Sequence, residues 1–157
     1  MKTFYTLLLA FGLCLTSHAQ DLQVLSNNSI SLTESEMTEF KTLAFNATHS
    51  LIFDDSTTSI YNDGSTVKRV IIKNEAGVLL LNSYVTPLNN VRSLELEWNA
   101  GEVYNFSNQL NQKLPNLKFI YVKSYEMLNQ SNVENIIESL KSQFPNATIL
   151  YQILKDS

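Results

Sequence analysis

The feature that most constrains the fold is a pattern of apolar residues that recurs in the second half of the chain. Val91-x-x-Leu94-x-Leu96 is followed 26 residues later by Leu117-x-x-Ile120-x-Val122, and 30 residues further on by Ala147-x-x-Leu150. Each copy follows a similar segment: Leu88-Asn89-Asn90, Leu114-Pro115-Asn116 and Phe144-Pro145-Asn146. The alternation within each copy predicts a strand.

The segments between these strands carry apolar residues at helical spacing. They are Val103, Phe106, Leu110 and Leu114 in the first segment, and Val133, Ile136, Ile137, Leu140 and Phe144 in the second. The second begins with Ser131-x-x-Glu134, a capping box. Since a helix-length crossover joins each pair of strands, the strands are expected to be parallel.

This strand, turn and helix unit over residues 88–154 resembles the leucine-rich repeat, L-x-x-L-x-L-x-x-N/C-x-L. Asn99 matches the asparagine of the motif, whereas Tyr125 and Gln152 depart from it. The resemblance implies a parallel sheet with helices on one face and partner binding on the other. A βαβαβ segment in a compact α+β domain, with its sheet covered on both faces, explains the same periodicities.

The first half of the mature chain predicts a helix and then strands. Overlapping capping boxes at Ser31 and Thr33 precede apolar residues at helical spacing, which predicts a helix over residues 34–45. β-branched and aromatic runs over residues 50–84, separated by turn residues, predict a small antiparallel meander. In that interpretation Asn74-Glu75-Ala76-Gly77 is a turn and Val78–Tyr84 is the last strand.

The N-terminus has the pattern of a secretory signal peptide over residues 1–19. Lys2 precedes an apolar stretch, and Ser17-His18-Ala19 provides a cleavage site before Gln20. Together with the richness in Asn and Ser, this resembles exported proteins of Bacteroidetes-type bacteria and implies a periplasmic or secreted protein. Lipidation at Cys14 is disfavoured because Leu13 precedes it. Residues 20–157 then form a single α/β domain without an integral membrane segment.

Composition narrows the partners of this domain. Cleavage removes the only cysteine, so neither disulfides nor thiol chemistry remain, and the loss of Lys2 changes the formal net charge from −4 to −5. An acidic chain without a basic patch is unsuited to nucleic acid or an anionic membrane surface. We find no motif that calls for a cofactor.

Catalytic and metal-binding patterns are weak. His49 is expected to be an exposed residue at a helix end, and Asp54, Asp55 and Asp63 with Asn62 fit turn chemistry better than a calcium site. Glu95 and Glu97 lie on the same side of one predicted strand, as a carboxylate pair does in a glycosidase. Alternating glutamates on a solvent-facing strand are the commoner explanation.

Period-two alternation predicts the binding residues. If Leu94, Leu96, Ile120, Val122 and Leu150 face the helices, then the opposite face carries Ser93, Glu95, Glu97, Phe119, Tyr121, Lys123, Ile149, Tyr151 and Ile153. From these we take Glu95, Glu97, Phe119, Tyr121, Lys123 and Tyr151 as the candidate binding residues. An open aromatic face would be an interaction site, whereas a cover formed by the helix at 34–45 or the meander would make the same residues core.

The sequence therefore predicts a non-enzymatic recognition or scaffold module that binds a protein or glycan through its sheet face. One alternative is a small secreted hydrolase using carboxylates such as Glu95, Glu97 or Asp54, which requires a cleft holding two of them. Another is a periplasmic ligand-binding or cell-envelope accessory protein, whose signature is an apolar cavity between the sheet and the N-terminal helix.

Overall fold

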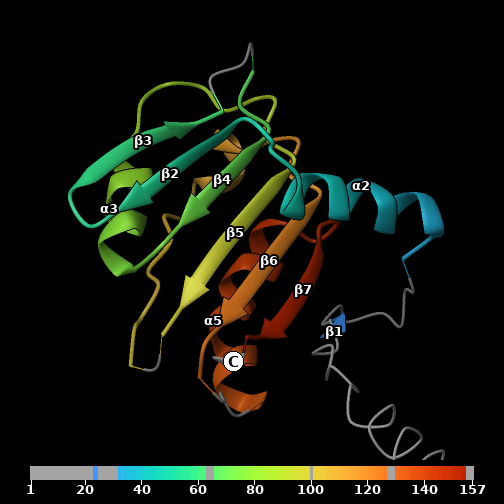
Figure 1. Cartoon of the computed structure of the whole chain (residues 1–157). Helices are drawn as coiled ribbons and strands as arrows, with labels where there is room; N and C mark the ends of the chain where they lie inside the picture. Colours follow the sequence, from blue (N-terminus) through green and yellow to red (C-terminus); the bar gives the residue numbers. More distant parts are fainter. Residues whose placement is uncertain (1–22, 25–31, 63–65, 100, 127–129, 155–157) are drawn as a thin grey trace, which may run out of the picture.

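The computed structural model describes residues 23–24, 32–62, 66–99, 101–126 and 130–154, and these form a seven-stranded sheet with helices on both faces (Figure 1). The strands are β1 (Gln23–Val24), β2 (Ser50–Asp54), β3 (Thr57–Tyr61), β4 (Arg69–Ile72), β5 (Ser93–Trp98), β6 (Phe119–Ser124) and β7 (Thr148–Ile153). The helices are α2 (Glu34–Phe45), α3 (Glu75–Ser83), α4 (Leu110–Lys113) and α5 (Gln130–Gln143).

The strand order is β1-β7-β6-β5-β4-β2-β3. The five central strands, β2, β4, β5, β6 and β7, are parallel and lie side by side in chain order. The edge strands β1 and β3 pair antiparallel with β7 and β2. The prediction of an α/β fold with a parallel sheet is confirmed. Because the order never reverses, the crossovers all return on one face of the sheet.

The repeated segments before the strands fold alike. The amides of Val91, Leu117 and Ala147 donate to the carbonyls three residues earlier, at 3.1, 3.2 and 3.0 Å. The side-chain amide of Asn116 donates to the backbone carbonyl of Asn89 in the preceding unit, at 2.8 Å. The matching segments are therefore equivalent turns that stack at the start of each strand.

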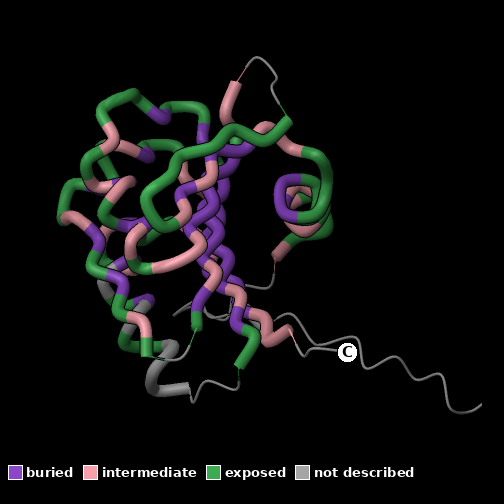
Figure 2. Tube along the Cα trace, turned by 60° about the vertical axis from the view of Figure 1, so that its left-hand side comes forward, coloured by how far each residue is buried: buried purple, intermediate pink, exposed green. Residues whose placement is uncertain are grey.

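Two separate clusters of buried side chains lie on opposite sides of the sheet. In Figure 2 the buried stretches of the backbone run through the sheet, with helices on either side of it. The larger one packs the sheet against α3, α4 and α5, and its members include Leu94, Leu96, Ile120 and Val122. The smaller one lies under α2, which crosses the other face (Figure 1). The predicted helix over residues 34–45 is confirmed, and Thr33 and Glu36 form its capping box.

The predicted meander is wrong beyond its first hairpin. β2 and β3 pair antiparallel as expected, but β4 is parallel to β2, and the predicted strand at Val78–Tyr84 lies mostly in helix α3. Asn74 begins this helix, because its side chain accepts the amide of Gly77 at 2.9 Å. The segment Asn74–Gly77 is thus a helix start, not a hairpin turn. A Cβ on Gly77 would lie 2.6 Å from the Phe53 carbonyl oxygen, so glycine lets α3 pack closely on β2.

The face assignment of the last strand is also wrong. Phe119 pairs with Thr148, so Tyr121 lies beside Leu150 and Val122 beside Tyr151. The lead-in to β7 is one residue shorter than the lead-in to β6, and a one-residue slip moves every side chain to the other face. Leu150 therefore packs under α2. Ile149, Tyr151 and Ile153 pack on the side of α5.

The first predicted crossover helix is much shorter than its pattern suggests. Of the helical stretch expected from Val103 to Leu114, only α4 at Leu110–Lys113 is helical. Tyr104 and Phe106 precede it in irregular backbone and are buried in the larger layer through aromatic contacts with Trp98 and each other. The expected capping box at Ser131 lies outside the residues whose side chains the structure describes.

Candidate functional site

The structure brings five of the six predicted binding residues onto one face of the sheet. Neighbouring strands place Glu95 beside Tyr121 and Glu97 beside Lys123, with Phe119 at the start of the same face. Tyr151 is on the opposite face. The expectation that Phe119, Tyr121 and Tyr151 share one face is therefore met by the first two only.

Helix α2 covers the aromatic part of this face. The ring of Phe40 lies 5.7 Å from that of Phe119 and 5.3 Å from that of Tyr121, between centroids, and all three side chains are fully buried. These residues are core, as in the alternative in which the sheet is covered on both faces. A partner cannot contact Phe119 or Tyr121 while α2 is in place.

Ion pairs attach α2 to the strand starts. Glu39 binds Arg92 and Lys118, each at 2.8 Å, and Nη1 of Arg69 donates to the carbonyl of Ala44 near the C-terminal end of α2, at 2.6 Å. Burial of Glu39 opposes its ionisation, but the hydrogen bond from Lys118 and the charges of Arg92 and Lys118 outweigh it and lower its pKa. The helix is therefore held at its polar side as well as by its buried rings.

Beyond α2, the same sheet face carries a row of alternating charges. Nζ of Lys73 lies 3.2 Å from Oε2 of Glu97, and Nζ of Lys123 lies 3.9 Å from Oε1 of Glu97. Lys123 also binds Glu95, which Arg69 approaches from the other side at 3.7 Å. Lysine and glutamate thus alternate from Lys73, directly after β4, across β5 to Lys123 on β6.

The accessibility of this row changes along the strands. Side-chain exposure falls from 39% at Lys73 to 17% at Lys123 and 16% at Glu97, while Glu95 retains only 3%. Burial alone would lower the pKa of Lys73, but the hydrogen bond and charge of Glu97 raise it above its ordinary value. Glu95 is therefore part of the structure, whereas Lys73, Glu97 and Lys123 can meet another molecule.

Two exposed aromatic residues accompany this row. The ring of Phe45, at the end of α2, is 6.0 Å from that of Tyr121 and the residue is 57% exposed. Tyr125, directly after β6, is 45% exposed. We call the set Phe45, Lys73, Glu97, Lys123 and Tyr125 the sheet-face strip.

Phe45, Lys73 and Tyr125 were not among the predicted binding residues. Tyr125 continues the alternation of Phe119, Tyr121 and Lys123, so its face was readable from the sequence. Lys73 joins the strip only because β4 is parallel to β5, which the meander prediction did not include.

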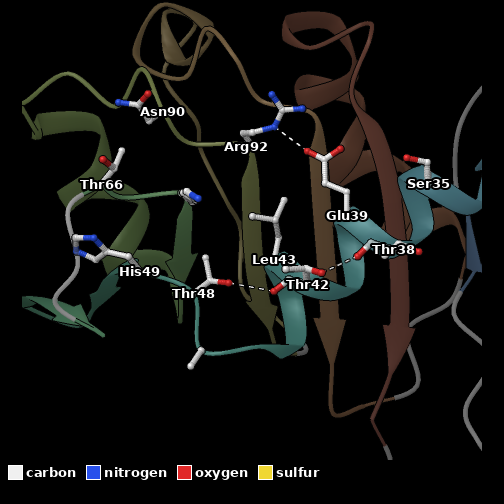
Figure 3. A pocket seen from close by; sticks show the side chains of 12 residues that line it. Ser35, Thr38, Glu39, Thr42, Leu43, Thr48, His49, Thr66, Asn90 and Arg92 are labelled. Carbon is white, nitrogen blue, oxygen red and sulfur yellow. Dashed lines mark hydrogen bonds and ion pairs between the residues drawn. The ribbon is translucent and has the colours of Figure 1, made fainter.

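A separate groove lies between α2 and the loops at the strand starts (Figure 3). Its volume is about 950 Å³, and its lining is Ser35, Thr38, Glu39, Thr42, Leu43, Ala47, Thr48, His49, Thr66, Lys68, Asn90 and Arg92. Several hydroxyls already donate to backbone: Thr42 to the carbonyl of Thr38 at 2.9 Å and Thr48 to that of Thr42 at 3.0 Å. The groove runs beside α2, and the space beneath α2 is filled by apolar side chains.

His49 differs from the exposed residue that the sequence predicts. It is half-buried between α2 and β2, and both ring nitrogens are buried with no hydrogen-bond partner in the described part of the chain. The groove it lines contains neither Glu95 nor Glu97. Among the described residues, no serine or carboxylate forms a hydrogen-bonded pair with His49, the arrangement that acid–base or nucleophilic catalysis uses.

The remaining acidic candidates have structural roles. Nδ2 of Asn74 donates to Asp54 and Asp55, at 2.9 Å each, which joins the β2–β3 turn to the start of α3. Within the described ranges, no group of three or more His, Cys, Asp or Glu side chains could hold a metal ion. Asp63 lies outside the described residues.

The fold and the sheet-face strip define an α/β protein whose sequential parallel sheet has one face packed by crossover helices and the other only partly covered. Comparison of the chain with models of known families, with curated proteins and with solved structures finds no match. Its function must therefore be argued from its own residues.

Proposed function

We propose that this protein is an exported recognition module that binds a protein or glycan partner through the sheet-face strip. The observation that carries the proposal is the row of Lys73, Glu97 and Lys123, which is held in place by ion pairs and flanked by exposed Phe45 and Tyr125. Side chains fixed before binding lose little conformational entropy on association. Aromatic residues beside charged groups are typical of binding hot spots.

The strand order favours a binding site on the face of the sheet rather than in a crevice at the strand ends. In open α/β sheets, ligand crevices form where the strand order reverses. Here the parallel strands follow one another without reversal. The parallel strands therefore form no such crevice, and the part of the sheet face beyond the edge of α2 is the surface that we assign to the partner.

The acidic residues fit recognition better than hydrolysis. Glu95 is buried against Arg69 and Lys123, and Glu97 binds Lys73 and Lys123. A carboxylate acting as acid or nucleophile needs a substrate in contact with it and a second carboxylate in the same cleft. Glu95 is too enclosed for such contact.

The export part of the proposal rests on the sequence. Residues 1–19 have the features of a cleaved leader, and the remaining chain contains no cysteine. In the part of the chain that the structure describes, no helix is long and apolar enough to cross a membrane. The leucine-rich-repeat resemblance over residues 88–154 supports partner binding on the face opposite the crossover helices.

Charge reversal on the strip tests the proposal. The wild-type protein, Glu97→Lys and the matched control Glu138→Lys would be screened against a glycan array and in crosslinking capture from the surface and culture fluid of the source cells. Glu138 is exposed on α5, on the other side of the sheet. We expect a saturable partner that Glu97→Lys loses and Glu138→Lys retains. Equal binding by both variants would exclude the strip as the site.

The groove beside α2 supports a second candidate, a ligand-binding protein. Its polar lining includes Lys68, Asn90 and Arg92, and its volume is in the range of small-molecule sites. The melting temperatures of wild type and Thr42→Phe would be measured with a panel of small polar metabolites. A compound that raises the melting temperature of wild type but not that of Thr42→Phe would support this role. No thermal shift with any compound would count against it.

A further inference from the structure

The outer edge of β3 is a free pairing surface. β3 is the last strand of the sheet, and all five of its residues are exposed. At the opposite edge, β1 pairs with β7 and closes the sheet. Within the described residues, the chain therefore protects one edge and leaves the other edge without a neighbouring strand.

The sequence of this edge lacks the usual protection against pairing. Edge strands of natural proteins carry lysine, proline or a bulge that blocks another strand. The strand Thr57-Thr58-Ser59-Ile60-Tyr61 has no charge, no proline and no glycine, in a chain whose formal net charge is −4. Its residues are β-branched or aromatic, apart from Ser59, and such residues favour strand pairing.

The sequence of β3 is also complementary to itself. An antiparallel pairing about a two-fold axis at Ser59 places Thr57 opposite Tyr61 and Thr58 opposite Ile60 of the other copy. Pairs of aromatic and β-branched residues are among the favourable cross-strand pairs. The absence of charge in β3 means that no like charges face each other across this contact, although both copies are acidic.

We propose that β3 pairs with β3 of a second copy of this chain, which joins the two sheets into one continuous sheet. Ile60 lies opposite Leu51 and therefore on the side of α3, where Leu79 is 63% exposed. These apolar residues extend the contact beyond the backbone. Five residues per strand give a small interface, so the dimer is a weak one that forms at high protein concentration.

This dimer would present two sheet-face strips on the same side. A two-fold axis through an antiparallel strand pair is perpendicular to the sheet and keeps each face on its own side. The charged residues of the strip lie on or directly after β4, β5 and β6, and β2 lies between these strands and β3. Dimerisation does not depend on the proposed function, but it would give the module two equivalent sites for a multivalent partner.

A charge-exchange experiment tests the pairing and its register. Sedimentation equilibrium would be measured for wild type, for Thr58→Lys/Ile60→Lys, for Thr58→Glu/Ile60→Glu and for an equal mixture of the two variants. In the proposed register, each variant places like charges opposite each other, and the mixture places lysine opposite glutamate. Both sites are exposed, so neither variant is expected to impair folding.

We expect a wild-type dimer, a dissociation constant raised about tenfold or more in each variant alone, and recovery in the mixture. Val103→Lys, at an exposed site on a loop, serves as the control and should dimerise like wild type. A monomeric wild type at several hundred micromolar would overturn the proposal. Dimers unaffected by the substitutions, or variants that fail to recover on mixing, would overturn the β3 pairing.

Discussion

Replacement of Phe40 by alanine tests whether α2 is a fixed part of the domain. Phe40 is the central side chain of the layer beneath α2 and makes ring contacts with Phe119, Tyr121 and Phe45. It has no exposed surface. Alanine would remove these contacts and leave a cavity against two rings that cannot shift, because β6 lies in the middle of the sheet.

The expected loss is about 4 kcal/mol in the free energy of unfolding, within the range for phenylalanine-to-alanine changes in cores. Aromatic contacts account for about 0.5–1.5 kcal/mol each of that loss. For a domain of this size the melting temperature should fall by about 10–20 °C. Urea and thermal unfolding followed by far-ultraviolet circular dichroism measure both quantities.

Phe45→Ala is the matched control. It removes the same side chain from the same helix, but at a position that is 57% exposed, and should cost less than about 1 kcal/mol. If Phe40→Ala cost less than about 1 kcal/mol, as the control should, the packing of α2 on β6 would be refuted. The aromatic sheet face would then be open, as in the first of the two alternatives that the sequence permits.

Three further predictions concern buried and half-buried polar groups. Lys113→Met should lower the free energy of unfolding in urea by about 2 kcal/mol, because the Lys113 ammonium donates to three carbonyls at the end of α3. Lys113→Arg should recover part of this loss. Glu95→Gln should lower the free energy of unfolding by about 3 kcal/mol, because buried Arg69 and half-buried Lys123 lose this carboxylate, whereas Glu138→Gln should be neutral in the same assay. Burial raises the pKa of Tyr104 and Tyr121 far above 10, so both side chains stay protonated in the folded state. Because both can ionise once unfolded, the free energy of unfolding should fall as the pH rises above 10. Tyrosinate absorbance should show that these two tyrosines ionise only when the protein unfolds.

The elements with strong local signals could be predicted from the sequence. Helix α2 has a capping box at its start and apolar residues on one side, so its bounds follow from local chemistry alone. The parallel arrangement of β5, β6 and β7 follows from repeated strand patterns separated by helix-length segments. Both signals depend on residues close together in the chain.

The errors have equally local causes. Asn74 followed by Gly77 is compatible with a turn and with a helix start, and the apolar run Val78–Leu81 fits a strand or a buried helix. The faces of β7 depend on a single residue in its lead-in, which the apolar pattern alone does not reveal. Neither ambiguity can be resolved without the neighbouring strand.

The candidate site shows a different limit. Alternation correctly placed Glu95, Glu97, Phe119, Tyr121 and Lys123 on one face, but exposure depends on where α2 lies across that face. A helix of 12 residues extends for about 18 Å and crosses the strands near their starts (Figure 1). That crossing buries Phe119 and Tyr121 and leaves Glu97 and Lys123 accessible.

The division of this face into covered and accessible parts agrees with the chemistry of its residues. Aromatic rings occupy the starts of the strands, where α2 supplies Phe40, Leu43 and Ala44. Lysine and glutamate follow further along β4, β5 and β6, where burial without a partner would be costly. The ion pairs neutralise most of the charge in this row while keeping its side chains at the surface. A partner whose own charge replaces one member of these ion pairs would meet side chains that are already held in position. Glu97→Lys removes the central carboxylate, so it breaks the ion pairs that hold Lys73 and Lys123.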